Sequence, residues 1–219
     1  MLSSGLPSVL LVLTVLQLSW SLSDEEKKII LNEHNRYRSQ VSPPARAMMK
    51  MTWDTHLEAV AQSDAENCIW ENGNGDYGRN VFAVAPTQNL QDAVKGWNEE
   101  KKFYSLVTGK CAPGQMCGNY KQLVWADTEH VGCGAKLCEK IRGIEAQNHR
   151  LLVCKYSPLG NKDGQMAYGK GPPCSQCPSG TVCKNKLCEE QKNAAGTPRT
   201  CSGLLLFLVS SATLVGLLL

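Results

Sequence analysis

The sequence predicts an α+β domain built of layered helices and strands, followed by a small segment that disulfides hold together. Helical periods and short apolar β-type runs are mixed between residues 24 and 156 without strict β-α alternation, which favours stacked layers. The 219-residue chain contains 11 cysteines, which is typical of proteins that mature in an oxidising compartment. The apolar stretches at the two ends have the features of processing signals, so they are left out of the fold.

Residues 1–23 are interpreted as a secretory signal peptide. The apolar stretch Val9 to Leu16 is followed by two small-x-small patterns, Ser19-Trp20-Ser21 and Ser21-Leu22-Ser23. Such a pattern precedes the cleavage site of signal peptides, so a cut is expected near Leu22 or Asp24. A membrane-spanning helix is the alternative, but a span needs about 20 apolar residues.

Residues 194–219 are interpreted as the propeptide of a glycosylphosphatidylinositol (GPI) anchor. The apolar tail Leu204 to Leu219 has no charged residue behind it, and the spacer 196–203 separates it from small residues. Small residues, a spacer of roughly 8–12 residues and a tail of roughly 10–20 form the GPI signal. Asn193 is the first choice for the attachment (ω) residue, with Ala194 and Ala195 as alternatives. An ordinary C-terminal membrane helix is the competing interpretation.

The chain between these two segments suits a single disulfide-bonded domain. Cys201 leaves with the tail, and the ten remaining cysteines are an even set. About 170 residues are enough to bury one modest core. The whole chain carries a formal charge of +3, which is no basic footprint for nucleic acid, so a nucleic-acid partner is not expected.

The first helix is expected to begin at a capping box and to end at about Ser39. The hydroxyl of Ser23 can accept from the amide of Glu26, whose carboxylate can reach back to residue 23. Three acids at the start suit the positive end of the helix dipole, and Pro43-Pro44 prevents continuation. A second helix is expected to begin near Asp54, with one apolar face. That face consists of Leu57, Ala61, Ala65 and Cys68.

The remaining regular elements are one more helix and three strands. NVFAV, residues 80–84, reads as a short strand. The third helix is expected over Asn89 to Tyr104, with Leu90, Val94 and Trp97 on one stripe. Two apolar runs, His130 to Cys138 and His149 to Tyr156, are predicted to be strands that close the domain.

The composition changes at Pro172. The stretch PPCSQCPSGTVCKNKLC is rich in Cys, Pro and Gly and has almost no apolar residues. It is too small to bury a core, so disulfides must hold it. A zinc knuckle is the competing interpretation of such spacing, but disulfides are favoured in a secreted chain. Residues 189–193 then form a polar linker to the ω site.

Four stretches together resemble one family. CGNYKQLVWADT (117–128) and LLVCKYSPLGN (151–161) resemble the two signatures of the CAP superfamily (cysteine-rich secretory proteins, antigen 5 and pathogenesis-related 1). EHNRYR in the first helix and WNEEKKFY in the third resemble it as well. The stretches DEEK, CAPGQMCG and CSQCPSGTVCKNKLCE are similar to the peptidase inhibitor 16 group. The long stalk usual in that group is absent between Cys188 and the tail. The resemblance implies a CAP domain at 24–170 and a cysteine-rich hinge at 171–188.

The resemblance implies a three-layer α-β-α sandwich and a set of disulfides. Spacing alone does not choose the pairs, since four hinge cysteines already allow three pairings. The pairs implied by the family are Cys68–Cys138, Cys111–Cys117 and Cys133–Cys154 in the domain, with Cys174–Cys183 and Cys177–Cys188 in the hinge.

The family's cleft carries two His and two Glu that can bind a divalent metal, and only one of these four residues is retained. The positions are Asn72, Arg79, Glu100 and Asn119, so both His and one Glu are replaced. An Asn amide does not substitute for imidazole as a zinc ligand. A guanidinium at about 4 Å costs about 4 kcal/mol per unit charge on the metal at an effective dielectric near 20. No metal and no cofactor are therefore predicted.

The replaced residues also argue against catalysis. A single carboxylate cannot act as both general acid and general base without a partner, and bridged cysteines leave no thiol nucleophile. The chain is predicted not to be an enzyme. An ion pair between Arg79 and Glu100 is expected to bridge the cleft that binds metal in the family.

The sequence therefore predicts a non-catalytic CAP protein at the extracellular face of the plasma membrane, or released from it, that binds another molecule. The partner is an unidentified extracellular protein, or a lipid or sterol. Lipid or sterol binding is the first alternative function, and some CAP relatives perform it through a loop near the first signature; here that loop is Val107 to Met116. Peptidase inhibition is the second alternative, and it is implied by the group's name alone.

Overall fold

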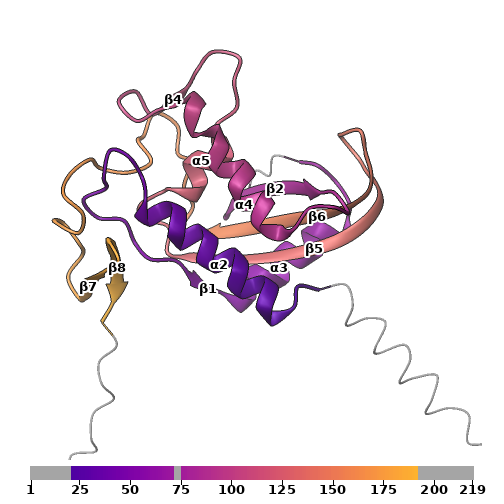
Figure 1. Ribbon diagram of the computed structural model, residues 1–219, viewed down its shortest axis with the longest axis horizontal. Helices are drawn as coiled ribbons and strands as arrows, with labels where there is room; N and C mark the ends of the chain where they lie inside the picture. The colour runs from indigo at the N-terminus through magenta and orange to yellow at the C-terminus, as the bar shows by residue number, and fades with distance from the viewer. Residues whose placement is uncertain (1–20, 72–74, 192–219) are drawn as a thin grey trace, which may run out of the picture.

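A central sheet separates one helix from three others in the computed structural model of the protein (Figure 1). The structure describes residues 21–71 and 75–191. Helix α3 (Thr55–Glu66) covers one face of the sheet, and α2 (Asp24–Ser39), α4 (Leu90–Glu99) and α5 (Gly118–Leu123) cover the other. The predicted α+β class and the three-layer α-β-α sandwich are confirmed.

The sheet has four strands in the order β1-β5-β6-β2. Strands β5 (His130–Ile141) and β6 (Ala146–Ser157) form a long antiparallel hairpin, and β2 (Gly78–Val84) pairs antiparallel with β6. The short β1 (Thr52–Trp53) runs parallel to β5. All three predicted strands are present, and each extends beyond its predicted bounds. Strands β5 and β6 are longer because polar residues near the turn of the hairpin pair without being buried, and β2 is longer because Gly78 and Arg79 also pair with β6.

Helix α2 begins at the predicted capping box. The Ser23 hydroxyl accepts from the amide of Glu26, and the Glu26 carboxylate accepts from the amide of Ser23 at 2.8 Å. Leu22, directly before the cap, is buried in the main core with 4% of its surface exposed. The start of the domain therefore depends on two residues upstream of Asp24.

We expect signal peptidase to cut after Ser21, so that the mature chain begins at Leu22. A cut after Ser23 would remove the capping hydroxyl, which is worth about 1 kcal/mol, together with a buried leucine side chain worth about 2 kcal/mol. N-terminal sequencing of the secreted protein measures the cut directly. A mature chain that begins at Asp24 would contradict this assignment.

Helix α3 lies close against the sheet. It begins at Thr55, close to the predicted start, and Asp54 caps it by accepting from the amide of Leu57 at 2.8 Å. A Cβ atom added at Gly134 of β5 would lie 2.3 Å from Cα of Gln62, so only glycine allows this approach. The prediction that Cys68 lies on the apolar face of this helix is wrong: the helix ends at Glu66, and Cys68 follows it with a positive φ of 51°.

The third predicted helix is shorter than expected. Helix α4 ends at Glu99, and a 3-10 helix, η1 (Glu100–Phe103), continues the chain to Tyr104. Because a 3-10 helix is wound more tightly than an α-helix, the side chains from Glu100 onward do not keep the α-helical spacing of α4. Among the short elements not predicted from the sequence are α5 and the paired strands β3 (Tyr104–Ser105) and β4 (Lys110–Cys111).

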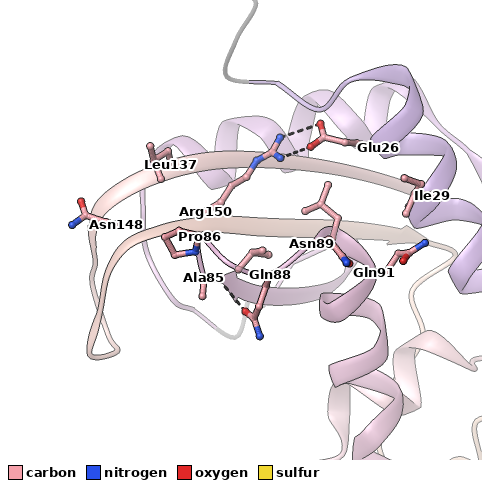
Figure 2. A pocket seen from close by; sticks show the side chains of 12 residues that line it. Glu26, Ile29, Ala85, Pro86, Gln88, Asn89, Gln91, Leu137, Asn148 and Arg150 are labelled. Carbon is pink, nitrogen blue, oxygen red and sulfur yellow. Dashed lines mark hydrogen bonds and ion pairs between the residues drawn. The ribbon is translucent and has the colours of Figure 1, made fainter.

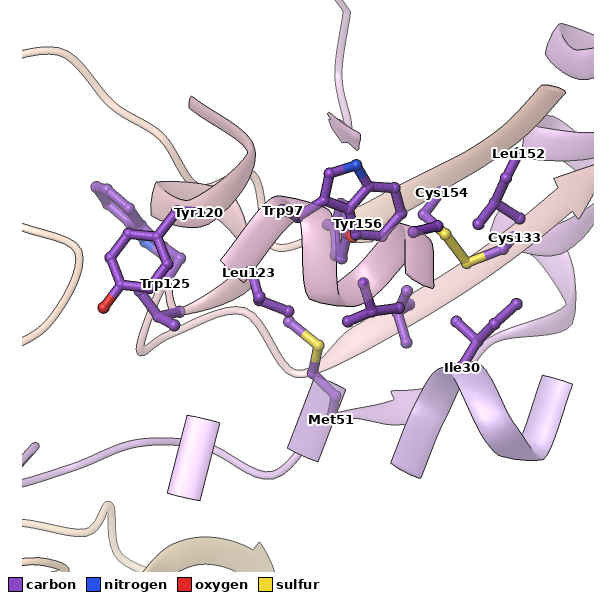
Figure 3. Close-up of a cluster of buried hydrophobic side chains, with 14 of the residues drawn as sticks. Ile30, Met51, Trp97, Tyr120, Leu123, Trp125, Cys133, Leu152, Cys154 and Tyr156 are labelled. Carbon is purple, nitrogen blue, oxygen red and sulfur yellow. A yellow bond between two sulfur atoms is a disulfide. The ribbon is translucent and has the colours of Figure 1, made fainter. Parts of the chain in front are cut away.

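The main core fills the space between the sheet and helices α2, α4 and α5 (Figure 3). Trp97 of α4 is 1% exposed, and its indole N–H donates to the carbonyl of Val81 at 2.9 Å. This bond satisfies the one polar atom of a large buried side chain. The core includes Ile30, Met51, Leu123, Cys133, Leu152, Cys154 and Tyr156.

His34 is buried within this core and stays neutral. Its Nδ1 lies 2.7 Å from the carbonyl oxygen of Ile30, and its Nε2 lies 2.9 Å from the hydroxyl of Tyr156. Since a carbonyl only accepts, Nδ1 carries the proton and Nε2 accepts from the tyrosine. Burial, with the nearby Arg38 charge, lowers the pKa of His34 from 6.5 to about 4.

We expect His34 to make the domain less stable in mild acid. Between about pH 6.5 and 4 the unfolded chain binds a proton at His34 that the folded chain does not. Its contribution to stability is complete above pH 6.5, falls as the pH drops, and is lower by about 3 kcal/mol at pH 4. Urea unfolding of wild type and His34→Gln across this range measures the effect. If the free energy of unfolding changed equally with pH in the two proteins, the destabilising role given to His34 would be contradicted.

The hinge is a disulfide-bonded hairpin that docks on the domain. Strands β7 (Thr181–Lys184) and β8 (Leu187–Glu190) pair with each other. Cys188 donates its amide to Met48 and accepts from Lys50, both at 2.8 Å. Leu187 is 3% exposed and belongs to the main core. The hinge is therefore continuous with the domain core.

Five disulfides join the described cysteines, in the pairs that the family resemblance implies. Cys133 and Cys154 face each other in register on β5 and β6, and Cys68–Cys138 ties the end of α3 to β5. Among the described residues, no helix is long and apolar enough to cross a membrane. The predicted signal peptide core, ω site and apolar tail lie outside the described residues.

Candidate functional site

The first-signature segment is held in place by one buried arginine. Arg38 of α2 is 1% exposed, and its guanidinium donates only to backbone carbonyls. The distances lie between 2.7 and 3.1 Å. The accepting oxygens belong to Met49, Leu123, Trp125, Ala126 and Thr128.

Arg38 thereby fixes the end of α5 and the turn that follows it. Burial lowers the pKa of Arg38 to about 9, so the side chain is still charged at neutral pH. Since charge-assisted bonds are stronger than neutral ones, this arginine is the main anchor of the segment 123–128. The EHNRYR stretch places Arg38 one helical turn after His34, and both side chains are buried, but it does not show which carbonyls Arg38 binds.

Glu100, the one acid retained from the family's metal site, is bound to the start of α5. Its Oε1 accepts from Nδ2 of Asn119 at 2.7 Å, and its Oε2 accepts from the amide of Tyr120 at 3.0 Å. The Asn119 carbonyl in turn accepts from Nδ2 of Asn80 at 3.0 Å. Two of the four former ligand positions therefore bond to each other, and Asn119 acts as a donor to the carboxylate.

The predicted ion pair between Arg79 and Glu100 is wrong. Both residues are described, and Arg79 instead has its Nε 3.6 Å from Oδ2 of Asp64 on α3. The reason is the alternation of side chains along β2. Val81 packs against α3, and Arg79 has the same parity, whereas Asn80 faces α5. The prediction placed the two residues in one cleft without considering which face each occupies.

A cavity of about 640 Å³ lies at the start of β2, below α5. Arg79 and Asn119 both line it, together with Tyr77, Gln122 and the segment 159–163. Asn72, the remaining former ligand position, lies outside the described residues. Around Glu100 the described residues thus offer the amides of Asn80 and Asn119, where a metal site would need imidazoles and carboxylates. The Arg79 guanidinium lies beside Asp64 of α3 instead.

Metal-ligating side chains gather at one other place in the described part of the chain. The Sγ atoms of Cys174, Cys177 and Cys188 lie within 4.8 Å of one another. All three are bonded in the two hinge disulfides, so they have no thiolate to offer. This arrangement agrees with the disulfide interpretation of the hinge.

Two further hollows lie on the surface. One, of about 750 Å³, is bounded by the start of α2, the start of α4 and the hairpin (Figure 2). Its charged residues, Glu26 and Arg150, satisfy each other, with 3.2 Å between Arg150 Nη2 and Glu26 Oε2. Burial would raise the pKa of Glu26, but the bonds from Arg150 and Ser23 together lower it.

The other hollow is a groove of about 940 Å³ between the end of α2, η1 and the segment 166–170. Tyrosines form much of its lining, and Val107 at its rim is 90% exposed. The lining also includes Arg46, Lys101 and Lys170, and no acidic residue. We refer to it as the tyrosine groove; its tyrosines are Tyr37, Tyr104, Tyr120 and Tyr168.

Residues 31–156 match the family model described as "Cysteine-rich secretory protein family", CAP. Human peptidase inhibitor 16 is 46% identical over 187 residues, which is 84% of this chain and 40% of that protein. Human cysteine-rich secretory protein LCCL domain-containing 2 is 37% identical, over 80% of this chain and 39% of that protein. The chain thus spans about two fifths of the length of these curated relatives.

Solved structures agree with the fold. The structure titled hookworm platelet inhibitor has a TM-score of 0.64 and 26% identity, over 78% of this chain and 94% of that one. The structure titled NaASP2 with Zn²⁺ has a TM-score of 0.60 and 25% identity, over 76% of this chain and 96% of that one. Sequence and fold therefore agree, and the chain belongs to the CAP family, with similarity to peptidase inhibitor 16.

Proposed function

We propose that this CAP protein is a non-catalytic extracellular binding protein, displayed on the cell surface by a GPI anchor. The proposal rests on the hydrogen bonds of Glu100, whose two carboxylate oxygens accept from Asn119 and Tyr120. The amide of Tyr120 is one of the first in α5, which have no partner within the helix. Glu100 therefore acts as a structural acceptor for the start of this helix.

The described residues of this cleft do not supply the parts that hydrolytic chemistry needs. A metal-activated water needs three protein ligands with an open position, and a metal-free mechanism needs an acid and a base within reach of the substrate. Glu100 is bonded to α5, and Arg79 faces α3. Binding without catalysis is the activity that this arrangement supports.

Binding to intact cells tests this proposal. A soluble form that ends at Lys192, labelled with a fluorophore, should bind saturably to cells and compete with unlabelled protein. Because no metal is involved, EDTA should not change this binding. A lack of saturable binding on every cell type, or hydrolysis of a substrate that Glu100→Gln abolishes, would contradict a binding function.

The anchor is the part of the proposal that concerns residues 193–219. Replacing Asn193, Ala194 and Ala195 by bulky residues should prevent display that a GPI-specific phospholipase can release. A wild-type protein that stays on the membrane after this enzyme would favour an ordinary membrane helix instead.

Lipid or sterol binding is a second candidate, and the tyrosine groove supports it. Val107 and Met166 both line the groove and are 90% and 53% exposed, so an apolar rim faces solvent. Exposed apolar patches of this kind mark binding sites. Saturable sterol binding that Val107→Asp abolishes would favour this candidate. Leu137→Asp, at an exposed apolar residue outside the groove, is the matched control.

Peptidase inhibition is the third candidate. Its support is the name of the relatives, peptidase inhibitor 16. Titration of the purified protein against serine, cysteine and metallopeptidases would reveal it as stoichiometric loss of activity. Full activity of every peptidase at an excess of the protein would rule it out.

A further inference from the structure

The tyrosine groove carries three positive charges that the described residues leave unpaired. Its lining includes Arg46, Lys101 and Lys170 and no acidic residue. All three residues are exposed, and their charged ends form no ion pair or hydrogen bond with another described residue. Because they lie at the surface, a ligand can reach their charges directly from solvent. The groove therefore attracts negative charge.

Arg46 is held beside the groove by its backbone and by two glycines. Its amide donates to the carbonyl of Gly169 at 2.9 Å, and its carbonyl accepts from the amide of Gln176 at 2.9 Å. A Cβ at Gly169 would lie 2.5 Å from Nε of Arg46, and one at Gly171 would lie 2.9 Å from its Cβ. The side chain thus lies across the backbone of Gly169, which also lines the groove.

Two tyrosines give the groove an aromatic wall that solvent reaches. Tyr37 and Tyr104 are only partly buried, whereas Tyr120 and Tyr168 are 6% and 4% exposed and lie deeper. The rings of Tyr104 and Tyr120 pack together with 5.7 Å between their centroids. The Arg36 guanidinium lies 4.0 Å from the ring centroid of Tyr37. Both accessible rings are therefore supported by a neighbour.

The groove combines tyrosine rings, an apolar rim and cations, and each suits a different part of a ligand. Aromatic-lined grooves dock proline-rich segments in the polyproline II conformation, which is extended and already ordered before it binds. This conformation repeats every three residues, or about every 9 Å. Acids at every third position therefore follow one edge and can meet Arg46 and Lys101. The prolines between them can pack on the rings and on Val107 and Met166, which are 90% and 53% exposed.

We propose that the tyrosine groove docks an acidic, proline-rich segment of an extracellular partner protein. A sulfated polysaccharide would use the cations but leave the apolar rim in water, and a lipid tail would use the rim but leave most of the cations without a partner. An acidic proline-rich segment satisfies both. This inference rests on the proposed binding function and names the chemistry of the partner.

Fluorescence anisotropy with a labelled peptide of four Glu-Pro-Pro repeats and the processed full-length protein tests the inference. The peptide should bind saturably, and about 0.5 M NaCl should weaken it because the charges are exposed. A Lys-Pro-Pro peptide of the same length reverses the charge and should bind at least about tenfold more weakly. A Glu-Gly-Gly peptide keeps the charge but must lose more chain entropy on binding, so it should also bind at least about tenfold more weakly.

Lys101→Glu should weaken the Glu-Pro-Pro peptide at least about tenfold, because an acid then stands where the groove needs a cation. Lys95→Glu is the matched control: it makes the same charge change at an exposed residue of α4 that does not line the groove. The control should bind within about twofold of wild type. Near-ultraviolet circular dichroism should show that both variants fold.

Several results would overturn the inference. They are no saturable binding of the Glu-Pro-Pro peptide, equal binding of the Lys-Pro-Pro or Glu-Gly-Gly peptide, and equal effects of Lys101→Glu and Lys95→Glu. Heparin or phosphatidylserine vesicles that bind in place of the peptide, and that Lys101→Glu releases, would assign the groove to another class of ligand. Each of these results can occur while the protein still binds saturably to cells, so the proposed function and this inference fail separately.

Discussion

Replacing Arg38 by Met should lower the free energy of unfolding by roughly 3–5 kcal/mol, since a buried charged group that satisfies many partners is lost. The carbonyls of Met49, Leu123 and Thr128 receive hydrogen bonds from Arg38. Each buried carbonyl left without a donor costs about 1–3 kcal/mol. Methionine fills most of the volume and restores none of these bonds. Urea unfolding measures the loss as a lower midpoint.

Arg36→Met is the matched control for this prediction. Arg36 lies on the same helix, but its side chain is 43% exposed and pairs with Glu33 at the surface. Exposed ion pairs are worth about 0–1 kcal/mol, so the midpoint should hardly move. A loss below about 1 kcal/mol for Arg38→Met would contradict the anchoring role given to this residue.

Gly134→Ala should destabilise the domain by about 3 kcal/mol, at the upper end of the usual cost of overpacking. The new Cβ would lie 2.3 Å from Cα and 2.4 Å from N of Gln62, and both are backbone atoms of α3. The helix would have to move away from β5. That shift would break the bond from the Ala135 amide to the Gln62 side chain, which is 3.1 Å long.

Gly75→Ala controls for the general effect of replacing a glycine. A Cβ at Gly75 would meet nothing within 4 Å, so the free energy of unfolding should change by less than about 0.5 kcal/mol. The measurement is again urea unfolding. Equal stability of the two alanine variants would show that α3 does not approach the sheet as closely as described.

Much of the fold follows from local signals in the sequence. The capping box at Ser23 predicts where α2 begins, because capping depends on residues three positions apart, and the apolar face that starts at Leu57 predicts α3. The two apolar runs predict β5 and β6, since fully buried strands are continuously hydrophobic. The pairing of the cysteines and the α-β-α order instead came from the family resemblance, because neither follows from spacing.

The site was less predictable, since it depends on contacts between distant parts of the chain. Asn119 and Glu100 belong together, as the resemblance implies, but no local pattern reveals that Glu100 accepts the Tyr120 amide. The Arg79 side chain faces α3 because β2 alternates, and the register of β2 against β6 decides which residues face which layer. Arg38 likewise bonds to carbonyls about 90 residues away, which no pattern in EHNRYR shows.

The central claim is that the CAP framework is retained around a cleft that no longer binds metal, and calorimetric titration with Zn²⁺ tests it most directly. Asn119 stands at one of the family's ligand positions, and Glu100 is bonded to it and to the amide of Tyr120 in α5. We predict that wild type and Glu100→Gln give the same small, non-saturating heats at neutral pH. Saturable binding of one zinc ion by wild type that Glu100→Gln abolishes would contradict the claim.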